Sequence, residues 1–170
     1  MNYKGLSDVS GFNHKELLKH LNILEKTLVL KRILPFHTNK RTELVKSPKA
    51  FFLDSGFRDM VIRNFQPIEN RPDKGSLYEN FVASELMKAG VELKYWRTKS
   101  MAEVDFIVEK NNKVIPIEIK SNLARAQFTK SFASFLKKYK PAKSLVLSEK
   151  LFAEKNKTKF RPIFCVENEV

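Results

Sequence analysis

Residues 102–120, AEVDFIVEKNNKVIPIEIK, constrain the fold more than any other part of this chain. Two runs rich in Val, Ile and Phe, residues 104–109 and 114–120, suit a pleated surface. Between them Asn111-Asn112 can form a two-residue turn, because Asn tolerates the positive φ that such a turn requires. The sequence therefore predicts an antiparallel hairpin in which Asp105 lies directly opposite Glu118.

Alternation along the two strands predicts that the hairpin has one apolar and one charged face. Pro116 lacks an N–H, so it is a position where a bulge would shift this register by one residue. The predicted core face holds Val104, Phe106, Val108, Ile115, Ile117 and Ile119, and the predicted second face holds Glu103, Asp105, Ile107, Pro116, Glu118 and Lys120.

The two opposed carboxylates on the charged face require compensation, since like charges directly across a strand pair are destabilising. A divalent cation between Asp105 and Glu118 would provide it, and the ammonium group of Lys120 would provide part of it alone. A solvated outer face with a local lysine–carboxylate pair explains the same residues without any function. Both interpretations stay open at this point.

The net charge of +13 favours a polyanionic partner such as nucleic acid, although a Lys-rich, thermophile-like surface would give the same excess. The single cysteine, Cys165, excludes a disulfide within the chain and fits a reducing cytoplasm. The sequence contains no signal peptide, no apolar stretch of membrane-spanning length and no phosphate-binding loop, so we expect no membrane partner and no ATP hydrolysis by this chain.

The first part of the chain has the outline of a winged helix over residues 1–62. Leucines at helical spacing predict a helix over 13–28, with Asn13 as N-cap and Glu16 as its capping-box partner. Strand-like runs at 29–36 and 50–54 flank a polar, basic segment. A packing or dimerisation module has the same pattern. In the winged-helix interpretation, the residues facing a phosphate backbone are Lys15, Lys19, Lys26, Lys40 and Arg41.

Residues 63–75 are polar with two prolines and a glycine, which indicates a linker to a second domain over 76–170. Ser76 is the expected N-cap of a helix that stops at Gly90, and Glu79 lies on the packed side of that helix or acts in a capping box. The elements expected after it are a strand at 91–97, the hairpin, a helix at 123–139, a strand at 144–148 and an edge strand at 160–166.

This order, with acidic residues on the first helix and the two hairpin strands, resembles the PD-(D/E)XK nuclease superfamily, including archaeal Holliday-junction resolvases. The segments GSLYENFVASEL, YWRT, EVDFIVE and PIEIKS are similar to the C-terminal domain of a prokaryotic and archaeal family of P-loop AAA+ ATPases. In that family a winged helix precedes the nuclease-like domain, and NILEKTLVLKRILPF with SPKAFFLDSG is similar to it. The resemblance implies an α/β (α+β) fold with an αβββαβ restriction-endonuclease-like core and a mixed sheet, and an AAA+ ATPase module missing from this chain.

The resemblance also implies a catalytic set of Glu79, Asp105, Glu118 and Lys120. Mg²⁺ or Mn²⁺ would be held by the carboxylates of Asp105 and Glu118 and by the carbonyl of Ile119, because these cations prefer oxygen ligands. Lys120 would orient or deprotonate a water, or stabilise the transition state of phosphodiester hydrolysis. Further contacts to DNA phosphates are expected from Arg97, Arg125, Lys130, Lys137 and Lys138.

Two alternatives of other classes remain. The chain would be a non-catalytic DNA-binding or regulatory module of an AAA+ ATPase if its basic surface binds DNA without metal, in a salt-dependent way. It would be a protein-interaction platform, such as a homodimer, if it has no affinity for DNA at low salt.

Overall fold

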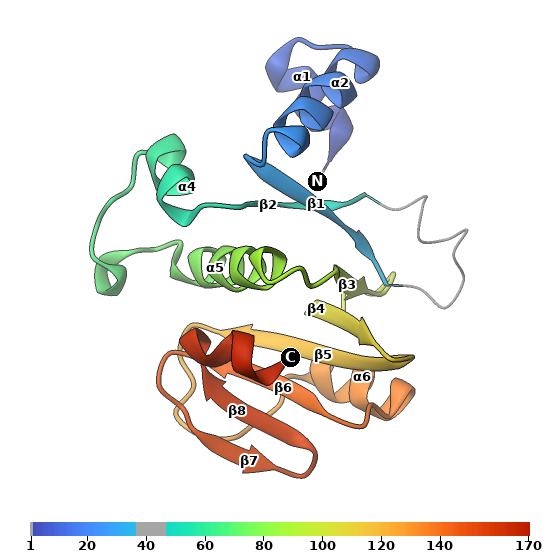
Figure 1. Ribbon diagram of the computed structural model, residues 1–170, viewed down its shortest axis with the longest axis vertical. Helices are drawn as coiled ribbons and strands as arrows, with labels where there is room; N and C mark the ends of the chain where they lie inside the picture. The colour runs from blue at the N-terminus through green and yellow to red at the C-terminus, as the bar shows by residue number, and fades with distance from the viewer. Residues whose placement is uncertain (1, 37–46) are drawn as a thin grey trace.

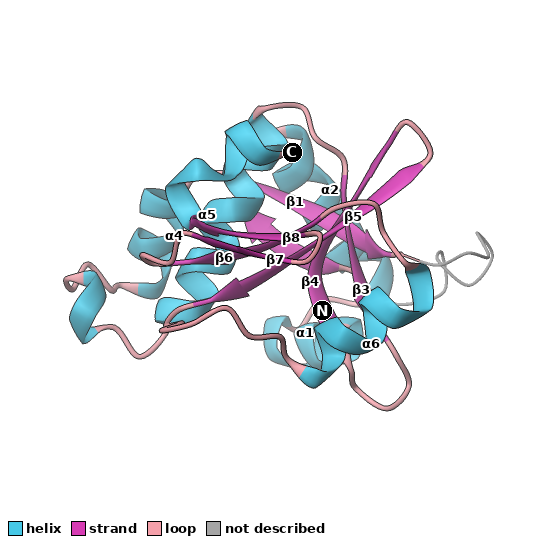
Figure 2. Cartoon of the chain, turned by 90° about the horizontal axis from the view of Figure 1, so that it is seen from below, coloured by secondary structure: helices cyan, strands magenta, loops and turns pink. Residues whose placement is uncertain are grey.

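The computed structural model describes residues 2–36 and 47–170 and is built around one mixed sheet of eight strands (Figure 1). The strand order is β2-β1-β3-β4-β5-β6-β8-β7. Helix α5 (Lys74–Lys88) covers one face and helix α6 (Lys130–Tyr139) covers the other, as the side view shows (Figure 2). Each helix packs on its own cluster of buried apolar residues. The predicted mixed α/β class is confirmed.

The N-terminal part consists of α1 (Tyr3–Ser10), α2 (His14–Lys26), β1 (Leu30–Pro35), β2 (Lys49–Phe52) and α4 (Ser55–Ile62). The predicted capping box of α2, Asn13 with Glu16, is confirmed. Strand β1 pairs antiparallel with β2 and parallel with β3 (Leu93–Arg97), so the first hairpin extends the sheet of the rest of the chain. Lys40 and Arg41 lie outside the described residues.

The helix expected from Ser76 begins earlier. Helix α5 starts at Lys74 and its N-cap residue is Asp73, whose side chain makes no capping hydrogen bond. The predicted N-cap at Ser76 is therefore wrong, and with it the capping-box role of Glu79, because both residues lie inside the helix. The predicted stop is confirmed: Gly90 follows the C-cap residue Ala89 with a φ of 76°.

Strands β4 (Glu103–Lys110) and β5 (Lys113–Lys120) form the predicted hairpin. Asn111 and Asn112 have φ values of 52° and 58°, and Phe106 pairs with Ile117, as the turn requires. Pro116 causes no bulge and pairs with Ile107 in regular register. Hydrogen-bonded and non-hydrogen-bonded pairs alternate from the turn, and this pair falls at a non-hydrogen-bonded position, where β4 needs no N–H from Pro116.

A register shift occurs instead between β3 and β4, where Tyr95 lies opposite both Asp105 and Phe106. The shift breaks the simple alternation predicted for β4. Val104 and Ile107 both pack in the cluster under α6, whereas Phe106 packs under α5. The prediction that Val104 belongs to the same face as Phe106, and Ile107 to a polar face, is therefore wrong.

The C-terminal half differs from the prediction at two elements. Helix α6 begins at Lys130 after its N-cap Thr129, so the helix predicted from residue 123 is too long. The last strand, β8 (Thr158–Pro162), ends at its proline, and η2 (Ile163–Glu169) follows. Strand β8 lies between β6 (Ser144–Ser148) and β7 (Ala153–Lys155), so the edge predicted for it belongs to β7.

The segment between α4 and α5, predicted as a linker, contains the short helix η1 (Ile68–Asn70) and the buried Arg71. Within the described residues, no helix has both the length and the apolar character needed to cross a bilayer.

Candidate active site at the end of the β4–β5 hairpin

The candidate site begins where the ladder between β4 and β5 stops. The last registered pair is Phe106 with Ile117. Beyond it, the Ile119 N–H donates a hydrogen bond of 2.7 Å to Oδ2 of Asp105. A carboxylate thus accepts a main-chain N–H near the point where the strands separate, which fixes Asp105 beside Ile119. These two residues were both predicted as metal ligands, and the structure brings them together.

The carboxyl group of Asp105 is electrostatically frustrated. Burial, the charge of Glu118 and the charge of Glu79 raise its pKa to about 7, against the opposing effects of the Ile119 N–H and Lys49. Glu79 on α5 and Glu118 on β5 are therefore close enough for their charges to act on Asp105. This local excess of negative charge is unusual in a chain of net charge +13.

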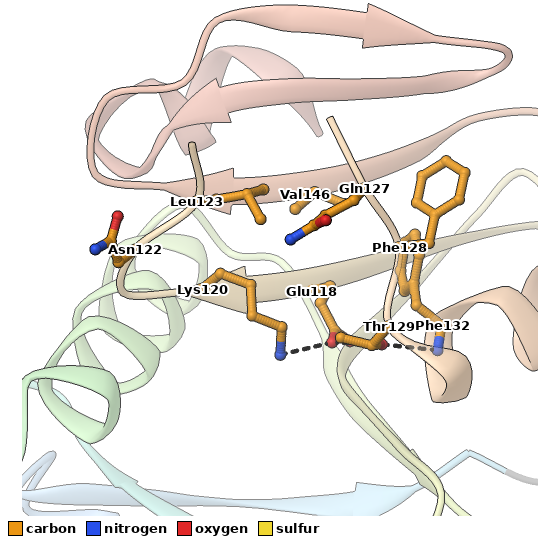
Figure 3. A pocket seen from close by; sticks show the side chains of 9 residues that line it. All are labelled: Glu118, Lys120, Asn122, Leu123, Gln127, Phe128, Thr129, Phe132 and Val146. Atoms are coloured by element: carbon orange, nitrogen blue, oxygen red, sulfur yellow. Dashed lines mark hydrogen bonds and ion pairs between the residues drawn. The ribbon is translucent and has the colours of Figure 1, made fainter. Parts of the chain in front are cut away.

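Glu118 lies on the α6 side of the sheet and is 4% exposed. Its Oε1 contacts Lys120 Nζ at 2.7 Å and accepts a hydrogen bond of 3.0 Å from the hydroxyl of Thr129 (Figure 3). The Thr129 oxygen in turn accepts the N–H of Phe132 at 3.1 Å and so caps α6. The N-terminus of α6 therefore positions the carboxylate, a role for Thr129 that the sequence analysis missed although a Thr before a helix is a recognisable signal.

Glu118 and Lys120 line a pocket of about 160 Å³ between β5 and the loop that leads into α6. Figure 3 shows Lys120 and Thr129 approaching the Glu118 carboxylate from opposite sides, with the amides of Asn122 and Gln127 near the rim. The remaining lining residues are Leu123, Phe128, Phe132 and Val146. The pocket thus combines an apolar wall with a small number of charged and amide groups.

Glu79, the predicted catalytic residue on α5, is bound to a lysine that the sequence analysis did not select. Lys49 on β2 contacts Glu79 at 2.7 Å and also pairs with Glu103 on β4. Lys49 is in phase with the buried Phe51, so its position on the packed side of β2 was detectable from strand alternation. Glu103 also pairs with Arg97. Burial acts to raise the pKa of Glu103, but Arg97 and Lys49 outweigh it and lower that pKa.

The predicted DNA contacts fall into two groups. Lys15, Lys19 and Lys26 are exposed on α2, whereas Arg125 and Lys130 are exposed in and after the loop that lines the pocket. Figure 1 separates α2 from α6 along the long axis of the molecule. The remaining predicted contacts are Arg97, which is half-buried and paired with Glu103, and Lys137 and Lys138, which are exposed on α6.

The donor set at the hairpin end fits a hard divalent cation in its chemistry. Asp105 and Glu118 each use one carboxylate oxygen in the contacts described above, and a carboxylate has two, so oxygen lone pairs remain on both groups. Burial, followed by the charges of Glu118 and Glu79, raises the pKa of Asp105, and such an ion would offset these effects. In the described part of the chain, no group of three or more His, Cys, Asp or Glu side chains is arranged as a metal site, so a main-chain oxygen such as that of Ile119 and water would complete the shell.

A family model described as a domain of unknown function, DUF4143, matches residues 74–165, which is more than half of the chain. The chain belongs to the DUF4143 family. DUF4143 is a domain found in AAA-ATPase-associated proteins. A second domain of unknown function, DUF8612, matches residues 1–67, so the α1–β2 part and the α5–β8 part of this DUF4143 chain match different models.

Two curated relatives are similar to this DUF4143 chain: the uncharacterized proteins Rv2008c of Mycobacterium tuberculosis and Mb2031c of Mycobacterium bovis. Each is 32% identical over 106 residues, which cover 60% of this chain and 24% of the relative. The chain thus spans about a quarter of the length of the curated relatives it matches. No solved structure matches it.

Proposed function

We propose that this DUF4143 chain hydrolyses phosphodiester bonds of DNA in a reaction that depends on Mg²⁺ or Mn²⁺. The observation that carries the proposal is the buried Asp105 at the open end of the β4–β5 hairpin, where its carboxylate accepts the Ile119 N–H. Burial first, and then the charges of Glu118 and Glu79, raise the pKa of Asp105 to about 7. Like charges held together in a buried place cost stability, and a cation-binding role explains why such an arrangement is kept. The proposal agrees with the PD-(D/E)XK-like order of these residues along the chain.

Asp105, Glu118 and the Ile119 carbonyl would hold the metal ion. When bound, the ion would place positive charge against the scissile phosphate and make a nearby water more acidic. Lys120, which reaches the same pocket, would orient that water and donate hydrogen bonds to the charge that develops on the phosphate. Thr129 holds the Glu118 carboxylate in place through the hydroxyl hydrogen bond.

The basic surface supports DNA as the substrate. Arg125 lies in the pocket-lining loop and Lys130 begins α6, so both would contact phosphates on either side of the cleaved bond. Lys15 and Lys19 on α2 would contact a more distant part of a long duplex. We further propose that the reaction takes place in the cytoplasm, in association with an AAA+ ATPase module, which accords with the proteins in which DUF4143 occurs.

The direct test incubates the protein with supercoiled, branched and single-stranded DNA in 5 mM Mg²⁺ or Mn²⁺, concentrations of about the order at which such ions bind carboxylate sites. We expect nicking or cleavage that EDTA abolishes and that Asp105→Asn, Glu118→Gln and Lys120→Met each reduce by about 100-fold or more. DNA binding by each variant is measured in parallel by fluorescence anisotropy. Cleavage that persists in all three variants would reject the proposed site.

A second candidate function is metal-independent DNA binding by a non-catalytic module. The observation in its favour is that lysine ammonium groups already approach the site carboxylates: Lys120 contacts Glu118, and Lys49 contacts Glu79. This candidate predicts anisotropy titrations that weaken steeply with salt and are unaffected by EDTA, without product in the cleavage assay. A third outcome, no binding even at low salt, would point to a protein-interaction module. Sedimentation would then show whether the chain associates with itself.

A further inference from the structure

Lys49 connects the two differently matched parts of the molecule. It belongs to β2, within the residues matched by DUF8612, whereas its partners Glu79 and Glu103 lie in the residues matched by DUF4143. Its side chain is 17% exposed, and those of Glu79 and Glu103 are 26% and 24% exposed. A largely buried ammonium group thus lies between two carboxylates, and its charge also acts on Asp105.

The position of Lys49 is well defined by its surroundings. Its Nζ lies 5.5 Å from the centre of the Tyr95 ring, a favourable cation–π distance. The Tyr95 hydroxyl donates a hydrogen bond of 2.6 Å to the carbonyl of Ser47, two residues before Lys49, and so ties this segment to β3. Lys49 and Glu79 also line an open pocket of about 480 Å³ between β2 and α5, so dissolved ions can reach them.

We propose that Lys49 takes the place of a second divalent cation and thereby limits the site to one metal ion. Glu79 and Glu103 supply oxygen ligands of the kind that Mg²⁺ and Mn²⁺ prefer, and Lys49 pairs with both of them. The segment before the DUF4143 region thus sets the number of ions at a site whose carboxylates come from the DUF4143 region. The inference rests on the proposed function, because it assumes a first ion at Asp105 and Glu118.

The test counts bound Mn²⁺ by isothermal titration calorimetry and by the electron paramagnetic resonance signal of free Mn²⁺. We expect about one ion per chain for the wild type and about two for Lys49→Met, because removing the ammonium leaves Glu79 without this partner and leaves Glu103 with Arg97. Lys49→Arg keeps the charge and should stay near one. Lys31→Met removes an exposed lysine from the neighbouring strand β1 and is the matched control, also expected near one.

A second variant keeps the inference testable if Lys49→Met does not fold. Glu79→Gln should weaken the single wild-type Mn²⁺ site by less than about 5-fold, because it removes a charge near Asp105 but not a ligand, since Glu79 is paired with Lys49. A loss of about 10-fold or more would make Glu79 a ligand of the first ion and overturn the inference. In Lys49→Met, the added Glu79→Gln exchange should return the count to about one.

The outcomes separate this inference from the proposed function. A wild type that binds no Mn²⁺ would sink the proposed function and the inference together. One ion in the wild type and still one in a folded Lys49→Met variant would leave the proposed function intact and overturn the role of Lys49. One ion in the wild type and two in the variant would support both.

Discussion

Two clusters of charged side chains differ in how their charges are balanced. Arg58 and Arg71 face Asp59 and Asp73 between α4 and α5, two cations against two anions. At the end of the β4–β5 hairpin, by contrast, burial and then the charges of Glu118 and Glu79 raise the pKa of Asp105 to about 7, although lysines pair with both of these neighbours. Buried charges that satisfy one another hold segments together, whereas a buried carboxylate whose pKa is raised by its surroundings indicates a site that can bind a cation.

The geometry of the balanced cluster supports this contrast. Arg71 donates two hydrogen bonds to Asp59, of 2.6 and 2.8 Å, and two to Asp73, of 3.0 and 2.9 Å. A further bond of 3.0 Å reaches the main-chain oxygen of Asn64. The hydrogen bonds from Arg71, followed by those from Arg58, outweigh burial and lower the pKa of Asp73. A guanidinium group uses all five N–H donors only when acceptors surround it, as they surround Arg71. These hydrogen bonds fix the segment that was predicted as a linker.

Breaking the balanced cluster should produce the largest effect. Arg71→Met removes the cation and leaves two carboxylates without their main partner, so we expect the free energy of unfolding to fall by about 3–5 kcal/mol. Urea denaturation followed by circular dichroism measures this change. Lys99→Met, at an exposed position, is the control and should stay within about 0.5 kcal/mol of the wild type. A loss below about 1 kcal/mol for Arg71→Met would mean that the two clusters do not differ in their structural role.

The raised pKa of Asp105 should make the stability of the protein depend on pH. Because the folded-state pKa of Asp105 is about 7 and the ordinary value is 3.8, the folded state binds more protons than the unfolded state between these values. The contribution of Asp105 to stability is therefore full below about pH 4 and is lost as the pH rises through 7. Asp105→Asn removes this contribution.

We expect the wild type to lose about 2–4 kcal/mol more stability than Asp105→Asn between pH 4 and pH 8. Urea denaturation at several pH values measures the difference, and groups common to both proteins cancel in the comparison. The Asn side chain can still accept the Ile119 N–H, so the local structure should be kept. If the free energy of unfolding changes equally with pH in the two proteins, the pKa of Asp105 is not raised in the folded state.

Local patterns in the sequence predicted the frustrated site better than the balanced joint. The Asn111-Asn112 turn sets the β4–β5 register as far as the pair of Phe106 with Ile117, and Asp105 and Glu118 follow directly after this pair. Turn chemistry and strand alternation act within a few residues, so the sequence is enough to apply them. Arg71 lies in a polar, proline-containing stretch, and the sequence alone does not distinguish a buried arginine from an exposed loop arginine there. Its burial depends on Asp59 of α4, which contacts it only in the folded chain.

The missed features share a second cause, which is contact between distant segments. Lys49 reaches Glu79 and Glu103 only because β1 joins β3 and brings β2 over α5, a parallel pairing that no local pattern specifies. The start of α6 at Lys130 depends on Thr129, whose hydroxyl serves both the helix and Glu118. Periodicity alone extended that helix to residue 123, since apolar residues of the preceding loop also pack inward.

A divalent cation that binds at Asp105 should raise the free energy of unfolding. At pH 8 we expect 10 mM Mg²⁺ to stabilise the wild type by about 1.4 kcal/mol if the dissociation constant is about 1 mM, because binding to the folded state alone stabilises it by mass action. Asp105→Asn should show less than about 0.3 kcal/mol, and Mg²⁺-free buffer of matched ionic strength provides the reference. Equal stabilisation of both proteins would mean that Mg²⁺ acts elsewhere, for example through general screening.

The smallest expected effect concerns the hydroxyl that orders the pocket. Thr129→Val keeps the size of the side chain but loses the cap of α6 and the hydrogen bond to Glu118, so we expect a loss of about 1 kcal/mol. Thr129→Ser retains the hydroxyl and should recover most of that loss. Because a plain cap does not interact with a metal site, the two variants also distinguish between roles: if Thr129 positions Glu118 for an ion, Mn²⁺ affinity should fall in Thr129→Val and recover in Thr129→Ser. A loss of stability with unchanged Mn²⁺ affinity would confine Thr129 to the helix and assign the order of the Glu118 carboxylate to Lys120 instead.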